Sequence, residues 1–353
     1  MSSEAAGQRL WMVRLGRHGE FEPRALDDKK LRISFGIGHD ISHLNSREAL
    51  TEEMAKMFPE DKPGRHKNFA TQINQFKNVA KTGDLVVTPL KTTSTIAIGR
   101  FAGPYEVGPD GACERPVEWF QTEIPRDAFK QDMLHSLGAI GTVCEISRNN
   151  AVARFKAVVA TGKDPGDGQT PKTSATPVTE DAEEASDLPL DLVQVARDQI
   201  ERRMASVFAG HDFTELVAAL LRAQGYQTRV SPPGADQGVD IVAGSGPLGL
   251  DAPRIVVQVK SGSQTVDQPT LQALIGSIHD VQADHGLIVS WGGYTSNVRR
   301  RLNELFFRVR LWGRDDVIDA FLTHYDKLPE DMRAELPMKR IWTLVLDDDE
   351  ELS

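Results

Sequence analysis

Two short apolar runs separated by a Gly/Pro turn constrain the fold of this chain more than any other stretch. They occupy residues 239–243 and 254–259 within PGADQGVDIVAGSGPLGLDAPRIVVQVK, residues 233–260. Runs of this length rich in Val and Ile predict strands, and the turn between them predicts a hairpin. Because side chains alternate along a strand, Gln258 and Lys260 are expected on one face and Val257 and Val259 on the other.

The polar residues of this hairpin predict a site for a metal ion and a phosphate. Asp240 is expected to face the end of the second strand, which would group a carboxylate, the Gln258 amide and the Lys260 ammonium. Such oxygen ligands suit Mg²⁺, and the lysine would position a metal-activated water or neutralise charge on a phosphate. The alternatives are a solvated carboxylate at a sheet edge and a solvated lysine at a strand end. An Asp within an apolar strand is disfavoured and costly to bury alone, which favours the metal for Asp240.

Three segments in this order resemble the Mrr branch of the PD-(D/E)xK nuclease superfamily. They are DFTELVAALLRAQGY, which contains Glu215, then GADQGVD, and then QVK at residues 258–260. The resemblance covers about residues 207–322, and in that branch Gln commonly occupies the second acidic position, here Gln258. It implies a restriction-endonuclease-like α/β domain with a central mixed sheet. It also implies hydrolysis of DNA phosphodiester bonds with Mg²⁺, or with Mn²⁺ in its place.

The resemblance also implies roles for individual residues. The catalytic residues would be Asp240, Gln258, Lys260 and Glu215, with the metal on Asp240, the Val259 carbonyl and Glu215. Glu215 has an equal alternative as a first-turn carboxylate placed favourably against the helix dipole. Asp236 is either a further support of the metal or a residue that stabilises its turn.

Segments around the hairpin predict an α/β domain over residues 188–340. Strands alternate with helices there, which predicts a central sheet that is at least partly parallel. The expected helices are 190–208, 211–226, 270–282, 296–306 and 315–328, with a strand and turn expected at 285–294 and a further strand at 308–313.

Residues 1–160 predict a small mixed α/β barrel-like domain. Strands are expected at 10–15, 31–38, 84–90, 94–103 and 117–124, and helices at 46–57, at 66–80 and near residue 159. The segments LGRHGE, GDLVVTPL and IAIGRFAGPYE resemble the PUA-like or EVE-like domain found ahead of many Mrr-type nucleases.

In related barrels an aromatic-walled pocket holds a flipped base. The resemblance implies a modified-base pocket here, with candidate walls and polar contacts at Trp11, Phe35, Tyr105, Trp119, Arg17 and Asn68. Each aromatic residue has a place in the core as its alternative, because aromatic side chains on apolar strands commonly pack inside. Arg17, beside Gly16, has a phosphate contact as its alternative.

The net charge of −10 argues against a nucleic-acid enzyme until its position along the chain is considered. Residues 161–187 hold seven acids and two lysines among many Pro, Thr and Gly residues, which predicts a flexible acidic linker. Residues 341–353 hold five acids and no base, which predicts an acidic tail. Both folded parts are therefore near neutral and leave room for a local basic face. The Arg-rich stretches 197–203 and 299–301 are either phosphate contacts or solvated helix faces.

Other signals exclude several classes of protein. No apolar run approaches the length of a membrane span and no secretory leader is present, so we expect a cytoplasmic protein with no membrane partner. Two cysteines, Cys113 and Cys144, cannot supply a zinc quartet and are expected to be buried thiols. Neither a Walker loop nor a Gly-x-Ser-x-Gly elbow occurs.

The sequence therefore predicts a restriction-type DNA endonuclease that defends against foreign or modified DNA. One site per chain must cut two strands, so a homodimer is expected at least on double-stranded DNA. Two alternatives stay open. The first is a non-cleaving protein that binds modified DNA, and the second is a nuclease whose amino-terminal domain senses a nucleotide signal or a protein partner.

Overall fold

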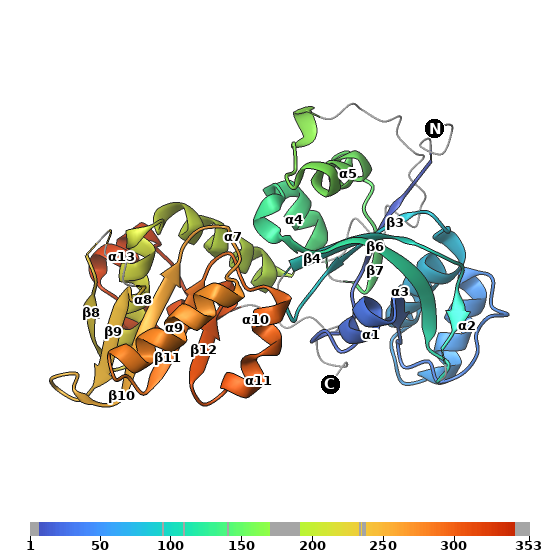
Figure 1. Cartoon of the computed structure of the whole chain (residues 1–353). Helices are drawn as coiled ribbons and strands as arrows, with labels where there is room; N and C mark the ends of the chain where they lie inside the picture. The colour runs from blue at the N-terminus through green and yellow to red at the C-terminus, as the bar shows by residue number, and fades with distance from the viewer. Residues whose placement is uncertain are drawn as a thin grey trace. The chain divides into compact units, whose positions relative to one another are not determined.

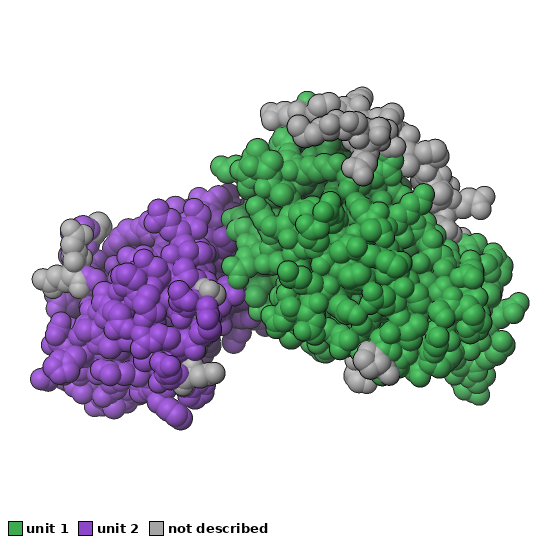
Figure 2. All heavy atoms as spheres, turned by 45° about the vertical axis from the view of Figure 1, so that its right-hand side comes forward, with its two compact units in different colours: residues 1–198, 343–353 green, residues 199–342 purple. Residues whose placement is uncertain are grey.

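The computed structural model describes residues 7–93, 95–108, 110–139, 141–169, 191–232, 234 and 238–342. The chain divides into two compact units, drawn in different colours in Figure 2. Unit 1 comprises residues 1–198 and 343–353, and unit 2 comprises residues 199–342. Helix α7 (Leu192–Val207) contains the boundary between them.

Unit 1 is built on a seven-stranded sheet in the order β2-β6-β4-β3-β1-β7, with β5 paired to β6. The strands are β1 (Leu10–Val13), β2 (Lys30–Ile33), β3 (Leu85–Pro89), β4 (Thr95–Phe101), β5 (Glu106–Val107), β6 (Cys113–Pro125) and β7 (Val143–Glu145). Only β1 and β3 pair in parallel among these strands, which are all within the described residues. The long strand β6 shifts register twice against β4, and such irregularities bend a sheet. The result is the strongly curved, half-closed sheet in Figure 1, in agreement with the predicted barrel-like α/β domain.

Helices cover both faces of this sheet. They are α1 (Glu22–Asp27), α2 (Arg47–Met57), α3 (Pro63–Asn74), the π-helix η1 (Gln75–Val79), α4 (Gln131–Leu137) and α5 (Ala151–Thr161), with the 3₁₀ turns η2 (Arg126–Ala128) and η3 (Asp167–Gln169). Trp11 and Val13 belong to the core under α2 and α3, whereas Leu10 and Met12 belong to the core under α4 and α5. Strand β1 is therefore buried on both faces, which explains its uninterrupted apolar sequence.

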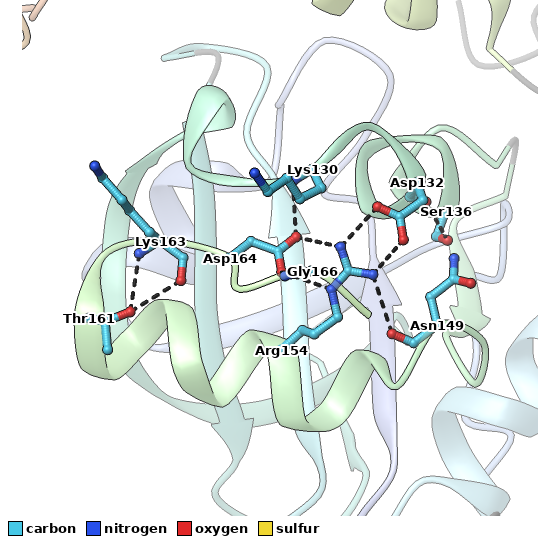
Figure 3. Close-up of polar contacts among 9 residues, drawn as sticks. All are labelled: Lys130, Asp132, Ser136, Asn149, Arg154, Thr161, Lys163, Asp164 and Gly166. Carbon is cyan, nitrogen blue, oxygen red and sulfur yellow. Dashed lines mark hydrogen bonds and ion pairs between the residues drawn. The ribbon is translucent and has the colours of Figure 1, made fainter. Parts of the chain in front are cut away.

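The ordered part of unit 1 extends beyond residue 160 and includes residues 161–169, which the sequence had assigned to the flexible linker. Helix α5 runs through Thr161, and Asp164 after it is buried and paired with Arg154 of the helix. Asp164 also accepts hydrogen bonds from the backbone N–H groups of Lys130 and Gly166, as Figure 3 shows. The rest of the predicted linker, residues 170–187, lies outside the described residues, as do residues 343–353 of the predicted tail.

Unit 2 has a five-stranded sheet in the order β12-β11-β10-β9-β8. The strands are β8 (Gln227–Val230), β9 (Ile241–Ser245), β10 (Asp251–Lys260), β11 (His285–Ser290) and β12 (Val309–Trp312). Strands β8, β9 and β10 pair antiparallel, whereas β10, β11 and β12 pair parallel. The predicted central mixed sheet and its hairpin are therefore confirmed.

Each face of the unit 2 sheet has its own hydrophobic core. One face packs under α8 (His211–Ala223) and α12 (Arg314–His324), and the other under α9 (Gln268–Asp280), α10 (Ser296–Arg300) and α11 (Leu302–Leu305). The 3₁₀ turn η4 (Tyr325–Lys327) and α13 (Glu330–Glu335) complete the unit. The predicted helix at 296–306 is thus two short helices in the structure.

Two further sequence expectations can be compared with the described residues. Cys113 and Cys144 are both buried and unbonded, and burial raises the pKa of the Cys113 thiol to about 11. Every helix in the described part of the chain is too short or too polar to cross a membrane.

Candidate active site

Asp240 is held at the point where β9 begins, against the end of β10. Its backbone N–H donates to the Val257 carbonyl at 2.9 Å, and its Oδ2 accepts the Val259 N–H at 2.6 Å. These two contacts lie on either side of Gln258 in the sequence, so the carboxylate sits beside the Gln258 position. The sequence had placed Asp240 within the strand, but in the structure Asp240 lies directly before it, because β9 begins at Ile241. Its carboxylate satisfies a backbone donor that β9 itself does not reach.

Ser231, which follows β8, holds the backbone at Val239 and Asp240. Its N–H donates to the Asp240 carbonyl at 2.8 Å, and its Oγ donates to the Val239 carbonyl at 2.7 Å. Gly238, two residues before Asp240, has a φ of +71°, a conformation that favours glycine. Ser231 could not be predicted as a site residue from the sequence, because its role depends on pairing between β8 and β9.

We expect Ser231→Ala to lower kcat for the predicted DNA cleavage about 10-fold to 100-fold with little change in KM. The reason is that losing the bond to Val239 loosens the backbone that aims the Asp240 carboxylate, and small misplacements of this kind are costly. Steady-state cleavage of an oligonucleotide duplex measures both constants. Ser231→Thr keeps the hydroxyl and should restore kcat. An equal rise of KM in both variants would contradict a positioning role.

Gln258 brings an amide oxygen to the same place. Its side chain is 6 % exposed, and within the described residues its Oε1 has no hydrogen-bond partner. A buried polar atom without a partner is unfavourable, and a cation would satisfy this oxygen. The Val259 carbonyl faces the same neighbour as the Val259 N–H, which bonds to Asp240, because both groups of an antiparallel strand residue point to one side. A carboxylate, an amide oxygen and a carbonyl are ligands that fit Mg²⁺ or Mn²⁺.

Lys260 is the last residue of β10 and is exposed. Its carbonyl accepts the Trp291 N–H at 2.9 Å, and its register partner on β11 is Ser290. It lies two residues after Gln258, so both side chains leave the same face of the sheet. Among the described residues, no ion pair involves the Lys260 ammonium. The charge is therefore available to a ligand.

Glu215 is not brought to this group by any contact within the described residues. Its helix α8 covers the face formed by Val257 and Val259, which is opposite to the face of Gln258. The Glu215 Oε1 lies 3.7 Å from His211 Nε2, and its Oε2 lies 3.6 Å from Arg222 Nη2. Its described partners are thus on its own helix, and its role at the metal stays a prediction. No three His, Cys, Asp or Glu residues converge as a metal cluster in the described ranges, and Asp236 lies outside them.

Trp11, one of the predicted pocket walls in unit 1, lies in the core instead. Trp11 is completely buried, and its Nε1 donates to Asp84 Oδ2 at 3.0 Å. The expectation that it forms a pocket wall is therefore wrong, since no surface of its ring is open for stacking on a base. The physical reason is that β1 lies between β3 and β7 in the sheet and is covered on both faces.

The other five candidate residues are partly buried. The Trp119 Nε1 donates to the Ala25 carbonyl at 2.7 Å, and the Phe35 ring lies 4.9 Å from that of Phe69. The Tyr105 ring lies 5.3 Å from Lys77 Nζ, and burial raises the pKa of its hydroxyl well above the usual range. The Asn68 Oδ1 accepts from Gln72 at 2.5 Å, and Arg17 lies in the loop between β1 and α1. All three aromatic side chains pack against the core under α2 and α3, so a base-binding role for them stays a prediction.

Comparison with protein families decides the class of unit 2. A family model described as restriction endonuclease, of the Mrr catalytic type, matches residues 205–321. Unit 2 is a restriction endonuclease domain. The match contains the helix with Glu215 and the strand segment with Gln258 and Lys260, so the resemblance to Mrr nucleases is confirmed for this unit.

A second family model, described as a domain of unknown function (DUF8426), matches residues 11–146. Because that family has no assigned function, the PUA-like or EVE-like resemblance of unit 1 stays a prediction. No curated protein matches the chain.

The chain is also similar to two solved structures at low TM-scores. One is the DNA modification-dependent restriction endonuclease AspBHI, with a TM-score of 0.32 and 16% identity over 71% of this chain and 67% of that chain. The other is the MspJI restriction endonuclease in complex with a 27-mer oligonucleotide, with a TM-score of 0.32 and 10% identity over 89% of this chain and 75% of that chain.

Proposed function

We propose that this chain is a Mg²⁺-dependent endonuclease that cleaves double-stranded DNA in defence against foreign or modified DNA. The observation that supports it most is the grouping of Asp240, Gln258 and Lys260 at the end of β10 within a restriction endonuclease domain. Two of these residues carry opposite charges, and the third has a buried amide oxygen without a described partner. Grouping two charges with a buried, unpaired amide oxygen costs free energy unless a ligand binds there.

The proposed cation site consists of Asp240, Gln258 Oε1 and the Val259 carbonyl. A divalent cation bound there would polarise the scissile phosphate and lower the pKa of a bound water. The Val259 N–H holds the Asp240 carboxylate in a single orientation, which preorganises the site. The Lys260 ammonium would orient the attacking water and neutralise charge that develops on the phosphate.

Unit 1 is proposed to select the DNA, because it is a separate compact unit joined to the nuclease through α7. Phe35, Tyr105 and Trp119 remain its candidate aromatic contacts for a modified base. A homodimer on DNA is part of the proposal, because each chain has one candidate site and a duplex has two strands.

The test is to incubate the full-length protein and Mg²⁺ with matched plasmids. One plasmid is unmodified, and the others carry methylated, hydroxymethylated or glucosylated cytosine. We expect cleavage of at least one modified plasmid and none of the unmodified one. A Lys260→Ala protein treated identically controls for contaminating nuclease. Equal cleavage of all plasmids would refute modification dependence, and binding without cleavage of any would favour a non-cleaving protein.

A further inference from the structure

Two adjacent phenylalanines are exposed on unit 2. Phe306 is 52% exposed and Phe307 is 87% exposed, and their ring centroids lie 5.1 Å apart in an edge-to-face arrangement. They follow α11 and precede β12. Two neighbouring aromatic rings left in water indicate a contact with a partner, since such rings are enriched where molecules bind.

The segment around this pair is strongly positive. Residues 296–312 contain five arginines and one acid, Glu304, in a chain whose net charge is −10. Arg310 lies over the Phe306 ring, with its Cζ 3.9 Å from the centroid, and also donates to the Phe306 carbonyl. This guanidinium supports the ring in its exposed position. We call Arg300, Arg301, Phe306, Phe307, Arg308 and Arg310 the arginine–phenylalanine arm.

The arm begins near the candidate active site and leads away from it. Helix α10 starts after the end of β11, where Ser290 pairs with Lys260, and β12 starts at Val309, which pairs with Gly286 at the other end of the sheet. Ser290 is four positions after Gly286 along β11, a span of about 13 Å. Val298 and Leu305 anchor the segment to the core that also holds Val256, and strand alternation puts Gln258 and Lys260 on that same face.

We propose that the arginine–phenylalanine arm binds the DNA duplex that flanks the cleavage point. Its arginines would contact backbone phosphates, and Phe307 would insert against a base step as an apolar wedge, supported by Phe306. The proposal rests on the nuclease function of the same unit. The charge favours DNA as the occupant, because a symmetric contact between two copies of this chain centred on the arm would bring two positive surfaces together.

The test measures duplex binding separately from cleavage. Fluorescence anisotropy of a labelled duplex is recorded over a range of salt concentrations with full-length Lys260→Ala protein in metal-free buffer. In this background, Arg300→Gln together with Arg308→Gln should reduce the slope of log Kd against log salt by about 1.8, or about 0.9 for each lost phosphate contact. Arg340→Gln is the control, because it removes one positive charge from an ion pair with Asp326 that lies outside the arm, and it should leave the slope unchanged.

Phe307→Ala should weaken duplex binding at least about five-fold without changing the slope, the lower end of what an aromatic contact with a base contributes. Phe307→Trp should restore binding. Because the Phe307 side chain is exposed, both variants should remain folded, and circular dichroism checks this. Unchanged duplex affinity of the Phe307→Ala protein would contradict the insertion of Phe307 against a base step. A shift from dimer to monomer in sedimentation, with unchanged affinity, would show that the pair contacts protein instead. If the wild type binds DNA through the arm but does not cleave it with Mg²⁺, the proposed nuclease function is wrong and the duplex-binding role of the arm is still supported.

Discussion

Asp240→Asn is expected to slow cleavage of a plasmid substrate at least about 100-fold while the protein remains folded. Losing one preorganised electrostatic contribution to a transition state commonly slows a reaction about 100-fold to 1000-fold, and Asp240 would contribute through the cation that it holds. Asn is the informative replacement because its amide oxygen can still accept the Val259 N–H that Asp240 Oδ2 accepts at 2.6 Å. The backbone contact is thereby kept, and the change is confined to the negative charge offered to a cation.

Lys260→Ala should give a loss of similar size for a different reason. Lys260 is an exposed residue at the strand end whose backbone contact with Trp291 does not involve the side chain, so folding should not depend on it. Linearisation and nicking rates at several Mg²⁺ concentrations distinguish the two variants. Asp240→Asn should demand more Mg²⁺, whereas Lys260→Ala should lower the rate at saturating Mg²⁺.

Asp251→Asn is the matched control, because Asp251 is an exposed carboxylate at the opposite end of the same strand. It should leave cleavage unchanged. Wild-type rates in both the Asp240→Asn and Lys260→Ala proteins would rule out the proposed site. Retained duplex affinity in both variants would place their effect on the chemical step.

Arg154→Leu is expected to destabilise unit 1 by about 3–5 kcal/mol, because it leaves a buried carboxylate without its cation. The Arg154 and Asp164 side chains are both completely buried and make two hydrogen bonds, of 2.8 and 2.6 Å. The same guanidinium donates to Asp132, at 2.8 Å for its Nη2 (Figure 3). Arg154 of α5 therefore binds both to α4, through Asp132, and to the segment after α5, through Asp164.

Hydrogen exchange of peptides from α5, compared with peptides from α8 in unit 2, measures this loss in the full chain. Arg100→Ala is the control within unit 1, because its ion pair with Glu118 is 48% and 54% exposed and should contribute less than about 1 kcal/mol. Equal exchange in the two variants would show that the buried cluster adds no more than the exposed pair.

The same cluster predicts how stability depends on pH. Burial would raise the pKa of Asp164, but hydrogen bonds from Arg154, Lys130 and Gly166 outweigh it and hold that pKa below its usual value. The bond from Arg154 likewise lowers the pKa of Asp132. A lowered carboxyl pKa stabilises the folded state fully above the unfolded value of about 3.9, and this contribution is lost as the pH falls below it. The difference between wild type and Arg154→Leu should therefore shrink between pH 5 and pH 3.

The chemistry of the candidate site could be predicted from the sequence because it lies within one hairpin. Asp240, Gln258 and Lys260 are close in the chain, and strand alternation with a short turn leaves few ways to arrange them. Glu215 was harder, because its helix packs on the opposite face from Gln258 and gives its carboxylate local partners. Which face of the sheet a helix covers depends on the whole sheet, so the sequence of the helix alone does not determine it.

Burial and long-range contacts explain the other differences. Trp11 was a candidate pocket wall through the resemblance to base-binding barrels, and only the sheet order showed that β1 is an inner strand. Residues 161–169 have the composition of a linker, yet Asp164 pairs with an arginine ten positions earlier that folding has buried. Local composition does not report whether a partner for a charge exists elsewhere in the fold.

The sequence by itself therefore determined the class of unit 2, its mixed sheet and the residue types of the candidate site, because these depend on alternation and short-range order. Tertiary structure alone decided which groups hold them in place. Ser231 and the Val259 N–H orient Asp240 from two different strand ends, and Phe306 and Phe307 are left exposed beside arginines. Such relations arise when strands distant in the chain pair and helices choose a face, so they become visible only once the sheet is assembled.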